Sequence, residues 1–279
     1  MIAPEIRAIA ARYGGEVSGD QALIPTPGHS SRDRGTAIRL VAGAPDGLLV
    51  ICRNGSQPEA LAVKDMLRRD GFLPERGAPR RELTPAEREA IRRATEARDR
   101  AKREGEVNAA RIARQTLASA FPADPGHRYI STKRIAPERL WQGRDSYGTP
   151  EALLVPMEDH RGIVWNVQSI APGRPKAKLF IRGARTKGLF WHAGEVTGAD
   201  RLVIGEGMAT VAAVRRATGL PVIAAMSASN LPDVALMAHT KWPDLTLIIA
   251  ADDDAKGWEA ARLASARTGA LIAAPGELA

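Results

Sequence analysis

Four acidic residues in the last third of the chain have the spacing needed for metal-dependent chemistry. Glu206 stands between two glycines just after the apolar run Leu202–Ile204, and Asp252 to Asp254 follow the apolar run Leu245–Ala250. Carboxylates brought together repel one another unless a cation or a proton intervenes. Oxygen ligands of this kind suit Mg²⁺, which can hold a phosphate and offset the charge that develops as the phosphate is transferred.

The elements that must position these acids are strands and helices that alternate over residues 201–279. Strands are expected at Leu202–Ile204, Pro221–Met226, Leu245–Ala250 and Ala270–Ala274, and helices at Met208–Thr218, Leu231–Thr240 and Ala255–Thr268. Such alternation predicts an α/β fold with a parallel sheet. Ligands of open α/β sheets bind at the carboxyl ends of the strands, so Glu206 and Asp252 to Asp254 are expected on one edge.

Other interpretations of these residues are weaker. A dinucleotide-binding turn needs a third glycine where this chain has Thr210, and no phosphate-binding G-x-x-x-x-G-K-[ST] loop occurs. Aspartates can also simply cap the helix that follows them. One aspartate would be enough for capping, whereas three occur here, opposite a glutamate from another strand.

Charge points to a polyanionic partner. The net charge is +8 and the isoelectric point is about 10.0, which favours binding to phosphates. Between residues 161 and 194 no acidic residue interrupts seven basic ones. Six of these are expected to hold nucleic acid or nucleotide: Arg174, Lys176, Lys178, Arg182, Arg185 and Lys187. Four interleaved aromatic residues, Trp165, Phe180, Phe190 and Trp191, fit base stacking or the core of a small sheet equally well.

The acidic pattern resembles that of Toprim domains. In that family a Glu-Gly turn follows the first strand, as Glu206-Gly207 does here, and an Asp-x-Asp with a nearby glycine follows the third, as Asp252, Asp254 and Gly257 do. Residues 227–231 also resemble the Ser-x-x-Asn-Leu turn of plasmid and phage Toprim primases. The resemblance implies that Glu206 is a general acid/base or metal ligand. It also implies that Asp252 and Asp254 bind Mg²⁺ or Mn²⁺.

The region before this domain is similar to the basic subdomain of bacterial-type DNA primases. Lys178 and Lys187 are similar in placement to lysines that face the template and nucleotide in that family, and Tyr129–Ile135 resembles a motif of mobile-element primases. This resemblance implies primer synthesis from ribonucleoside triphosphates on single-stranded DNA for a plasmid, phage or conjugative element. Any helicase or ATPase would be a separate chain. A Toprim nuclease and a non-catalytic replication accessory protein remain alternatives.

Four segments are predicted along the chain: a small N-terminal domain at 1–80, a long charged helix at 81–120, a basic α+β subdomain at 121–200 and the Toprim domain at 201–279. Thr84 and Pro85 are typical of a helix start, and this helix is expected to act as a solvated linker. The N-terminal domain resembles a zinc ribbon of which only His29 and Cys52 keep ligand positions. Since structural zinc needs four ligands, no zinc is expected.

The composition excludes several classes of protein. No apolar run approaches the length of a membrane span, and residues 1–15 carry charges without the apolar core of a secretion signal. A single cysteine, Cys52, excludes an internal disulfide. These features favour the cytoplasm and give no reason to expect a membrane partner.

Overall fold

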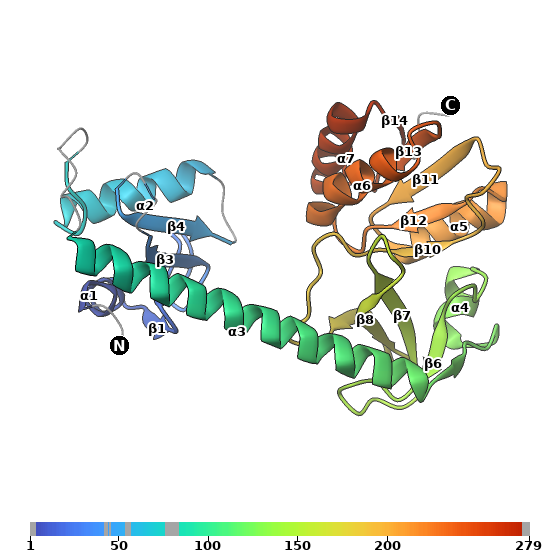
Figure 1. Cartoon of the computed structure of the whole chain (residues 1–279), viewed down its shortest axis with the longest axis horizontal. Coiled ribbons are helices and arrows are strands. Elements are labelled where there is room, and N and C mark those ends of the chain that lie inside the picture. Colours follow the sequence, from blue (N-terminus) through green and yellow to red (C-terminus); the bar gives the residue numbers. More distant parts are fainter. Residues whose placement is uncertain (1–3, 42–43, 45, 54–56, 76–83, 275–279) are drawn as a thin grey trace. The chain divides into compact units, whose positions relative to one another are not determined.

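The computed structural model describes residues 4–41, 44, 46–53, 57–75 and 84–274. The chain divides into two compact units, Met1–Asp99 and Arg100–Ala279, and each is described by itself (Figure 1). The mixed α/β class with a C-terminal parallel sheet is confirmed. The finer division into four segments stays a prediction.

The N-terminal unit packs two helices on an antiparallel sheet. Its elements are α1 (Pro4–Arg12), β1 (Glu16–Ser18), β2 (Gln21–Ile24), β3 (Thr36–Leu40), β4 (Leu48–Cys52) and α2 (Gln57–Arg69), with sheet order β1-β2-β3-β4. Side chains such as Ile6, Ile38 and Leu67 form the core. Cys52 Sγ lies 3.3 Å from the Thr36 hydroxyl, so it contacts a polar neighbour within the sheet. The resemblance to a zinc ribbon stays unconfirmed.

The long helix α3 (Pro85–Ala118) confirms the predicted helix but is more than a solvated linker. Its carboxyl-terminal half buries Ala109, Ala110 and Ala113. Ala109 and Ala113 pack in one apolar cluster with Leu154 and Val167 of the sheet that follows. Small alanines on one face allow the helix backbone to approach a sheet closely, and the sequence analysis missed this because alanine carries little hydrophobic signal.

That sheet is antiparallel and five-stranded, in the order β5-β6-β7-β8-β9. The strands are β5 (Phe121–Pro122), β6 (Trp141–Gly143), β7 (Ala152–Glu158), β8 (Val164–Ala171) and β9 (Arg174–Phe180), with the short helix α4 (Arg128–Lys133) between β5 and β6. Every residue of β7 is buried, which makes it the central strand of this subdomain.

The last sheet has the order β10-β12-β11-β13-β14. It comprises β10 (Trp191–Ala193), β11 (Arg201–Gly205), β12 (Val222–Ala224), β13 (Thr246–Ala250) and β14 (Leu271–Ala273), alternating after β11 with α5 (Met208–Thr218), α6 (Leu231–Lys241) and α7 (Ala255–Thr268). Among these described strands only β10 is antiparallel to its neighbour, and the sequence analysis did not predict it. Since α5 packs with one face of the sheet and α6 and α7 with the other, both faces are covered (Figure 1).

The two sheets of the second unit are joined through the backbone. Glu158 at the end of β7 and Phe190 just before β10 exchange both of their N–H···O hydrogen bonds, each 2.9 Å long. The buried Trp191 donates its indole N–H to the Arg139 carbonyl at 2.9 Å. Phe190 and Trp191 therefore belong to the core. Of the two roles left open by the sequence, base stacking and core packing, these two residues have the second.

Candidate metal and nucleotide site

Glu206 lies at the carboxyl end of β11, in a turn that only small residues permit. A Cβ on Gly205 would lie 2.7 Å from Val211 of α5, so a larger residue would push strand and helix apart. The Glu206 carbonyl accepts a hydrogen bond of 2.8 Å from the Met226 N–H beyond β12. This bond fixes the turn against the neighbouring strand.

The pKa of the Glu206 carboxyl group is raised above its ordinary value of 4.5. Burial is the largest cause, and the negative charges of Asp252 and Asp254 add to it. A hydrogen bond from the Ala228 backbone and the positive charge of Lys178 act in the opposite direction. The acids of two neighbouring strands and a lysine of β9 are thus close enough to influence one another, as the sheet topology predicted for the acids.

The three aspartates after β13 have different surroundings. Asp254 caps α7, since its Oδ1 accepts the Gly257 N–H at 2.7 Å. Asp252 makes a longer contact of 3.5 Å with the Thr210 hydroxyl of α5, and Asp253 is exposed. Helix capping therefore accounts for Asp254 and leaves Asp252 unexplained.

A turn that includes the short 3₁₀ helix η1 (Ala228–Asn230) closes the same edge of the sheet. The buried Asn230 donates its side-chain N–H groups to the carbonyls of Leu189 and Ala225, each at 2.8 Å. Met226, just before this turn, has a positive φ of 67°, an uncommon conformation for a residue with a side chain. The Ser-x-x-Asn-Leu pattern in the sequence did not indicate this structural role of Asn230.

The donor set fits a hard divalent cation in its chemistry. Carboxylate oxygens are the preferred ligands of Mg²⁺. The mutual repulsion seen in the raised pKa of Glu206 is what a bound cation would relieve. Within the described part of the chain, however, no three His, Cys, Asp or Glu side chains are arranged closely enough to hold one ion. Mg²⁺ usually keeps several waters and needs only one or two carboxylates, so such an ion would not need all three acids as direct ligands.

The C-terminal domain matches a known protein family. Residues 201–274 match the family model described as the Toprim domain. This part of the chain is a Toprim domain. The match covers β11 to β14 and includes Glu206, Asp252 and Asp254.

About 70% of the chain is similar in sequence to a DNA primase. The chain is 31% identical over 216 residues to DNA primase TraC of Escherichia coli, a match that covers 70% of this chain and 20% of the relative. The chain thus spans about a fifth of the length of that curated protein. The predicted resemblance to primases is confirmed.

Two solved structures are similar to half or more of this chain. A DNA primase domain from Pseudomonas aeruginosa shares 16% identity with a TM-score of 0.35, over 50% of each chain. The Aquifex aeolicus primase, with its zinc-binding and RNA polymerase domains, shares 12% identity with a TM-score of 0.44. That match covers 98% of this chain and 76% of the other.

The basic residues predicted to bind nucleic acid are in different environments. Lys178 lies near the Toprim acids, as its effect on Glu206 indicates. Lys187 pairs with Asp233 of α6 at 3.2 Å, and the Arg185 guanidinium lies 5.2 Å from the centre of the Trp165 ring. Arg182 is exposed. The side chains of two further candidates lie outside the described part of the structure: Arg174 and Lys176.

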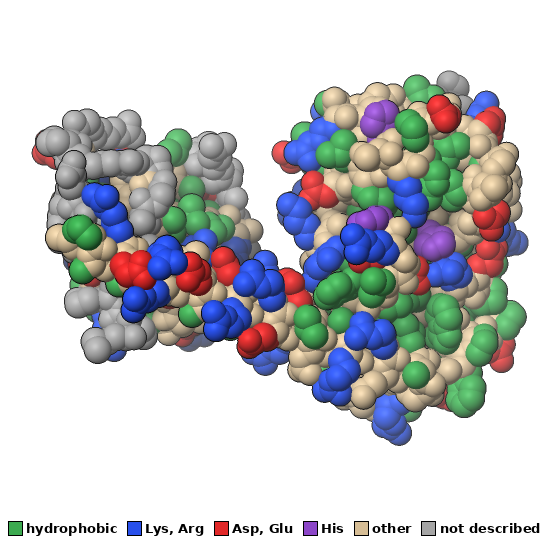
Figure 2. All heavy atoms as spheres, in the orientation of Figure 1, with side chains coloured by type: hydrophobic (Ala, Val, Ile, Leu, Met, Phe, Trp, Pro, Cys, Tyr) green, Lys and Arg blue, Asp and Glu red, His purple; other side chains and the backbone are tan. Residues whose placement is uncertain are grey.

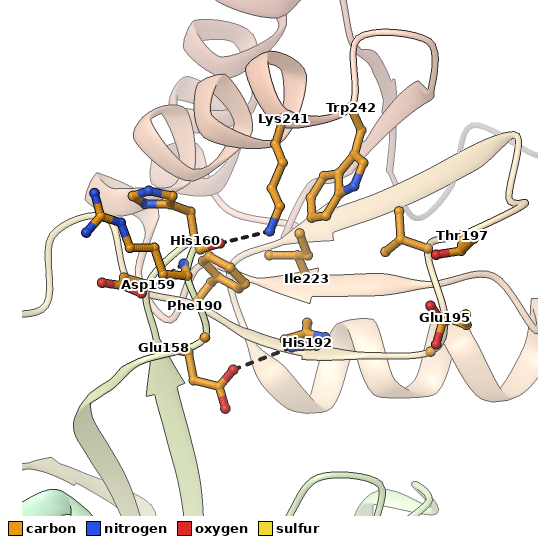
Figure 3. Close-up of a pocket in the computed structure, with 14 residues that line it drawn as sticks. Glu158, Asp159, His160, Phe190, His192, Glu195, Thr197, Ile223, Lys241 and Trp242 are labelled. Carbon is orange, nitrogen blue, oxygen red and sulfur yellow. Dashed lines mark hydrogen bonds and ion pairs between the residues drawn. The ribbon is translucent and has the colours of Figure 1, made fainter.

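A cavity of about 420 Å³ lies where the β7–β8 turn meets β10 and α6 (Figure 3). None of the Toprim acids lines it. Lys241 donates to the His160 carbonyl at 2.8 Å, and His192 lies 3.5 Å from the Glu158 carboxylate. Because these polar groups contact one another, the cavity residues fasten the turn to the Toprim domain. No motif in the sequence indicated them.

Proposed function

We propose that this chain is a DNA primase-type nucleotidyltransferase that makes short RNA primers on single-stranded DNA. Primers of this kind would serve the replication or transfer of a mobile element. The observation that carries the proposal is the position of Glu206 and Asp252 to Asp254 after the neighbouring parallel strands β11 and β13, within the residues that match the Toprim domain. Lys178 lies close enough to influence Glu206 there. Three acids and a lysine together suit a reaction that handles both a metal ion and a triphosphate.

In the proposed reaction the 3′-hydroxyl oxygen of the growing primer forms a bond to the α-phosphorus of a ribonucleoside triphosphate. The bond to pyrophosphate breaks, and the hydroxyl proton leaves. Asp252 and Asp254, with Glu206 beside them, are the residues that would hold Mg²⁺ (or Mn²⁺), and such an ion would supply positive charge to offset that of the reacting phosphate. A raised pKa suits Glu206 to accept the proton, because a base works best when its pKa approaches the working pH.

Basic side chains supply the complementary charge. Lys178 lies near the acids and is assigned to the triphosphate, while Arg182, Arg185 and Lys187, which follow it in the chain, are assigned to the template. Arg174 and Lys176 of β9 are assigned the same role. The partners are therefore single-stranded DNA and ribonucleoside triphosphates. The relative named as a DNA primase supports this assignment.

The decisive experiment is primer synthesis. Purified protein is mixed with single-stranded DNA, Mg²⁺ and four ribonucleotides, one of them labelled. Native protein should give labelled oligoribonucleotides. Both Glu206→Gln and Asp252→Asn should lower the yield at least 100-fold, on the order of what loss of an electrostatic catalytic group costs. Asp253→Asn is the matched control, since Asp253 is exposed and follows directly in the chain.

Each other outcome overturns either the proposed activity or the roles assigned to the acids. Intact DNA without labelled product would mean that the chain is a non-catalytic accessory protein. Shortened DNA that depends on Asp252 would identify a Toprim nuclease. Equal loss in the Asp253→Asn control would mean that charge at this edge, and no particular carboxylate, is what matters.

A further inference from the structure

The carboxyl-terminal half of α3 carries four arginines on one face, which we call the arginine stripe: Arg100, Arg103, Arg111 and Arg114. With 3.6 residues per turn, these four positions fall within an arc of about 80° and span about 21 Å along the helix. All four are exposed. They line a groove of about 520 Å³ together with Glu104 and Val107, so positive charge dominates it.

The rest of the helix holds this stripe outward. The buried positions Ala109, Ala113 and Thr116 lie on the opposite face. Of these, Ala109 and Ala113 pack with the β5–β9 sheet. Arg114 also donates to the Val164 carbonyl of β8 at 3.2 Å. Since the opposite face is pinned to a sheet, the stripe is a rigid surface of the second unit and the cost of ordering it on binding is small.

The arginines of the stripe differ from the other arginines of the same helix. In the amino-terminal half, Arg92 pairs with Glu89 and Glu96 at 2.7 and 2.8 Å, and Arg93 pairs with Glu89 at 2.6 Å. Among the described residues, the stripe has no ion pair of this kind. Arg111 instead contacts the neutral side chains Asn108 and Gln115. Exposed blue side chains are visible along the helix (Figure 2). The charge of the stripe is therefore available to a partner.

We propose that the arginine stripe binds the phosphate backbone of single-stranded DNA, as a second contact surface separate from the basic residues of β9 and the loop after it. Guanidinium groups match phosphate geometry through paired hydrogen bonds. A length of about 21 Å corresponds to about six nucleotides of one strand at B-form spacing. The choice of single-stranded DNA as the ligand rests on the proposed function. The inference concerns binding alone, so it does not require primer synthesis.

The test compares two double variants of the full chain. Arg103→Gln with Arg111→Gln removes charge from the stripe, and Arg92→Gln with Arg93→Gln removes the same charge from the paired arginines. Glutamine keeps nearly the helix propensity of arginine. Affinity for a labelled oligothymidylate is measured by fluorescence anisotropy between about 50 and 300 mM salt, without Mg²⁺ or nucleotides. Helix content is checked by circular dichroism.

The stripe variant should bind on the order of 10-fold more weakly at low salt, and its slope of log affinity against log salt should fall by about 1.4, since each single-strand phosphate contact contributes about 0.7. The paired variant should keep the native slope. Unchanged affinity in the stripe variant overturns the inference. The partner of the stripe would then be an acidic protein. Equal losses in both variants also overturn it, because they would report overall charge. If primer synthesis failed but the predicted binding pattern were found, the proposed function would be rejected and the inference about the arginine stripe would be retained.

Discussion

The side-chain oxygen of Asn230 accepts a hydrogen bond of 2.7 Å from the backbone N–H of Gly188. Its amide group donates to Leu189 and Ala225, so one buried residue joins the loop that carries Lys187 to the end of β12. Gly188 and Leu189 precede Asn230 by 42 and 41 residues in the chain, and Ala225 precedes it by five. Asn230 thereby sets the position of a basic loop relative to the turn of Glu206.

Replacing Asn230 with Ala should destabilise the protein by about 3 kcal/mol, because three backbone groups lose their partner, two of them in buried hydrogen bonds. Urea unfolding followed by circular dichroism measures this loss. Ser229→Ala is the control, since Ser229 is exposed on the same turn and should change stability by less than about 0.5 kcal/mol. Similar stability of both variants would show that solvent replaces the Asn230 contacts.

The raised pKa of Glu206 predicts how stability depends on pH in metal-free buffer. The folded state holds this proton more tightly than the unfolded state. The contribution of Glu206 is therefore fully present below the ordinary pKa of 4.5 and is lost as pH rises through the raised folded value. Native protein should lose stability over this range relative to Glu206→Gln. Parallel curves of unfolding free energy against pH for the two proteins would contradict the prediction.

Two neighbours should move the Glu206 pKa in opposite directions. Asp252→Asn removes a negative charge and should lower it, whereas Lys178→Gln removes a positive charge and should raise it further. Carboxyl titration by nuclear magnetic resonance of labelled glutamate measures both shifts without Mg²⁺. Asp253→Asn is the control for a change of one charge nearby. An unchanged pKa of Glu206 in Lys178→Gln would show that Lys178 is too far from the acid to influence it.

Gly257→Ala should destabilise the Toprim domain by about 2 kcal/mol and reduce Asp252-dependent activity. A Cβ at this position would lie 2.7 Å from the Asp252 carbonyl oxygen, so the loop that carries Asp252 must shift. Gly105→Ala in α3 is a matched control with the opposite sign. No atom would contact its Cβ, and it should stabilise the helix by about 1 kcal/mol. Thermal unfolding compares the stability of the two variants. Equal effects on stability would show that the crowding at residue 257 is relieved without cost.

In the N-terminal unit, Asp70 should make the protein sensitive to acid. The pKa of Asp70 is lowered chiefly by a hydrogen bond from the Tyr13 hydroxyl, which is 2.9 Å long, with a further contribution from Arg12. Its stabilising contribution is present above the ordinary pKa of 3.8 and is lost as pH falls through the lowered folded value. Tyr13→Phe should therefore reduce the loss of stability between about pH 5 and pH 2, measured by urea unfolding. An unchanged acid transition would contradict this.

The sequence by itself determined the elements of the Toprim domain and the identity of its acids. Helices and strands from Leu202 to Ala274 follow from local periodicity, and glycines at 219 and 269 end two helices in the left-handed conformation that glycine adopts easily. Alternating elements also imply a parallel sheet. The order of these elements alone therefore assigns Glu206 and Asp252 to one edge.

Only the tertiary structure decided which distant groups meet. The influence of Lys178 on Glu206, the hydrogen bonds of Asn230 and the backbone exchange between Glu158 and Phe190 all join residues far apart in the chain. Periodicity shows which face of an element is apolar, but it carries no information about the partner of a particular polar group. The packing of α3 was missed for a related reason, since alanine buries little area and yet permits the closest approach.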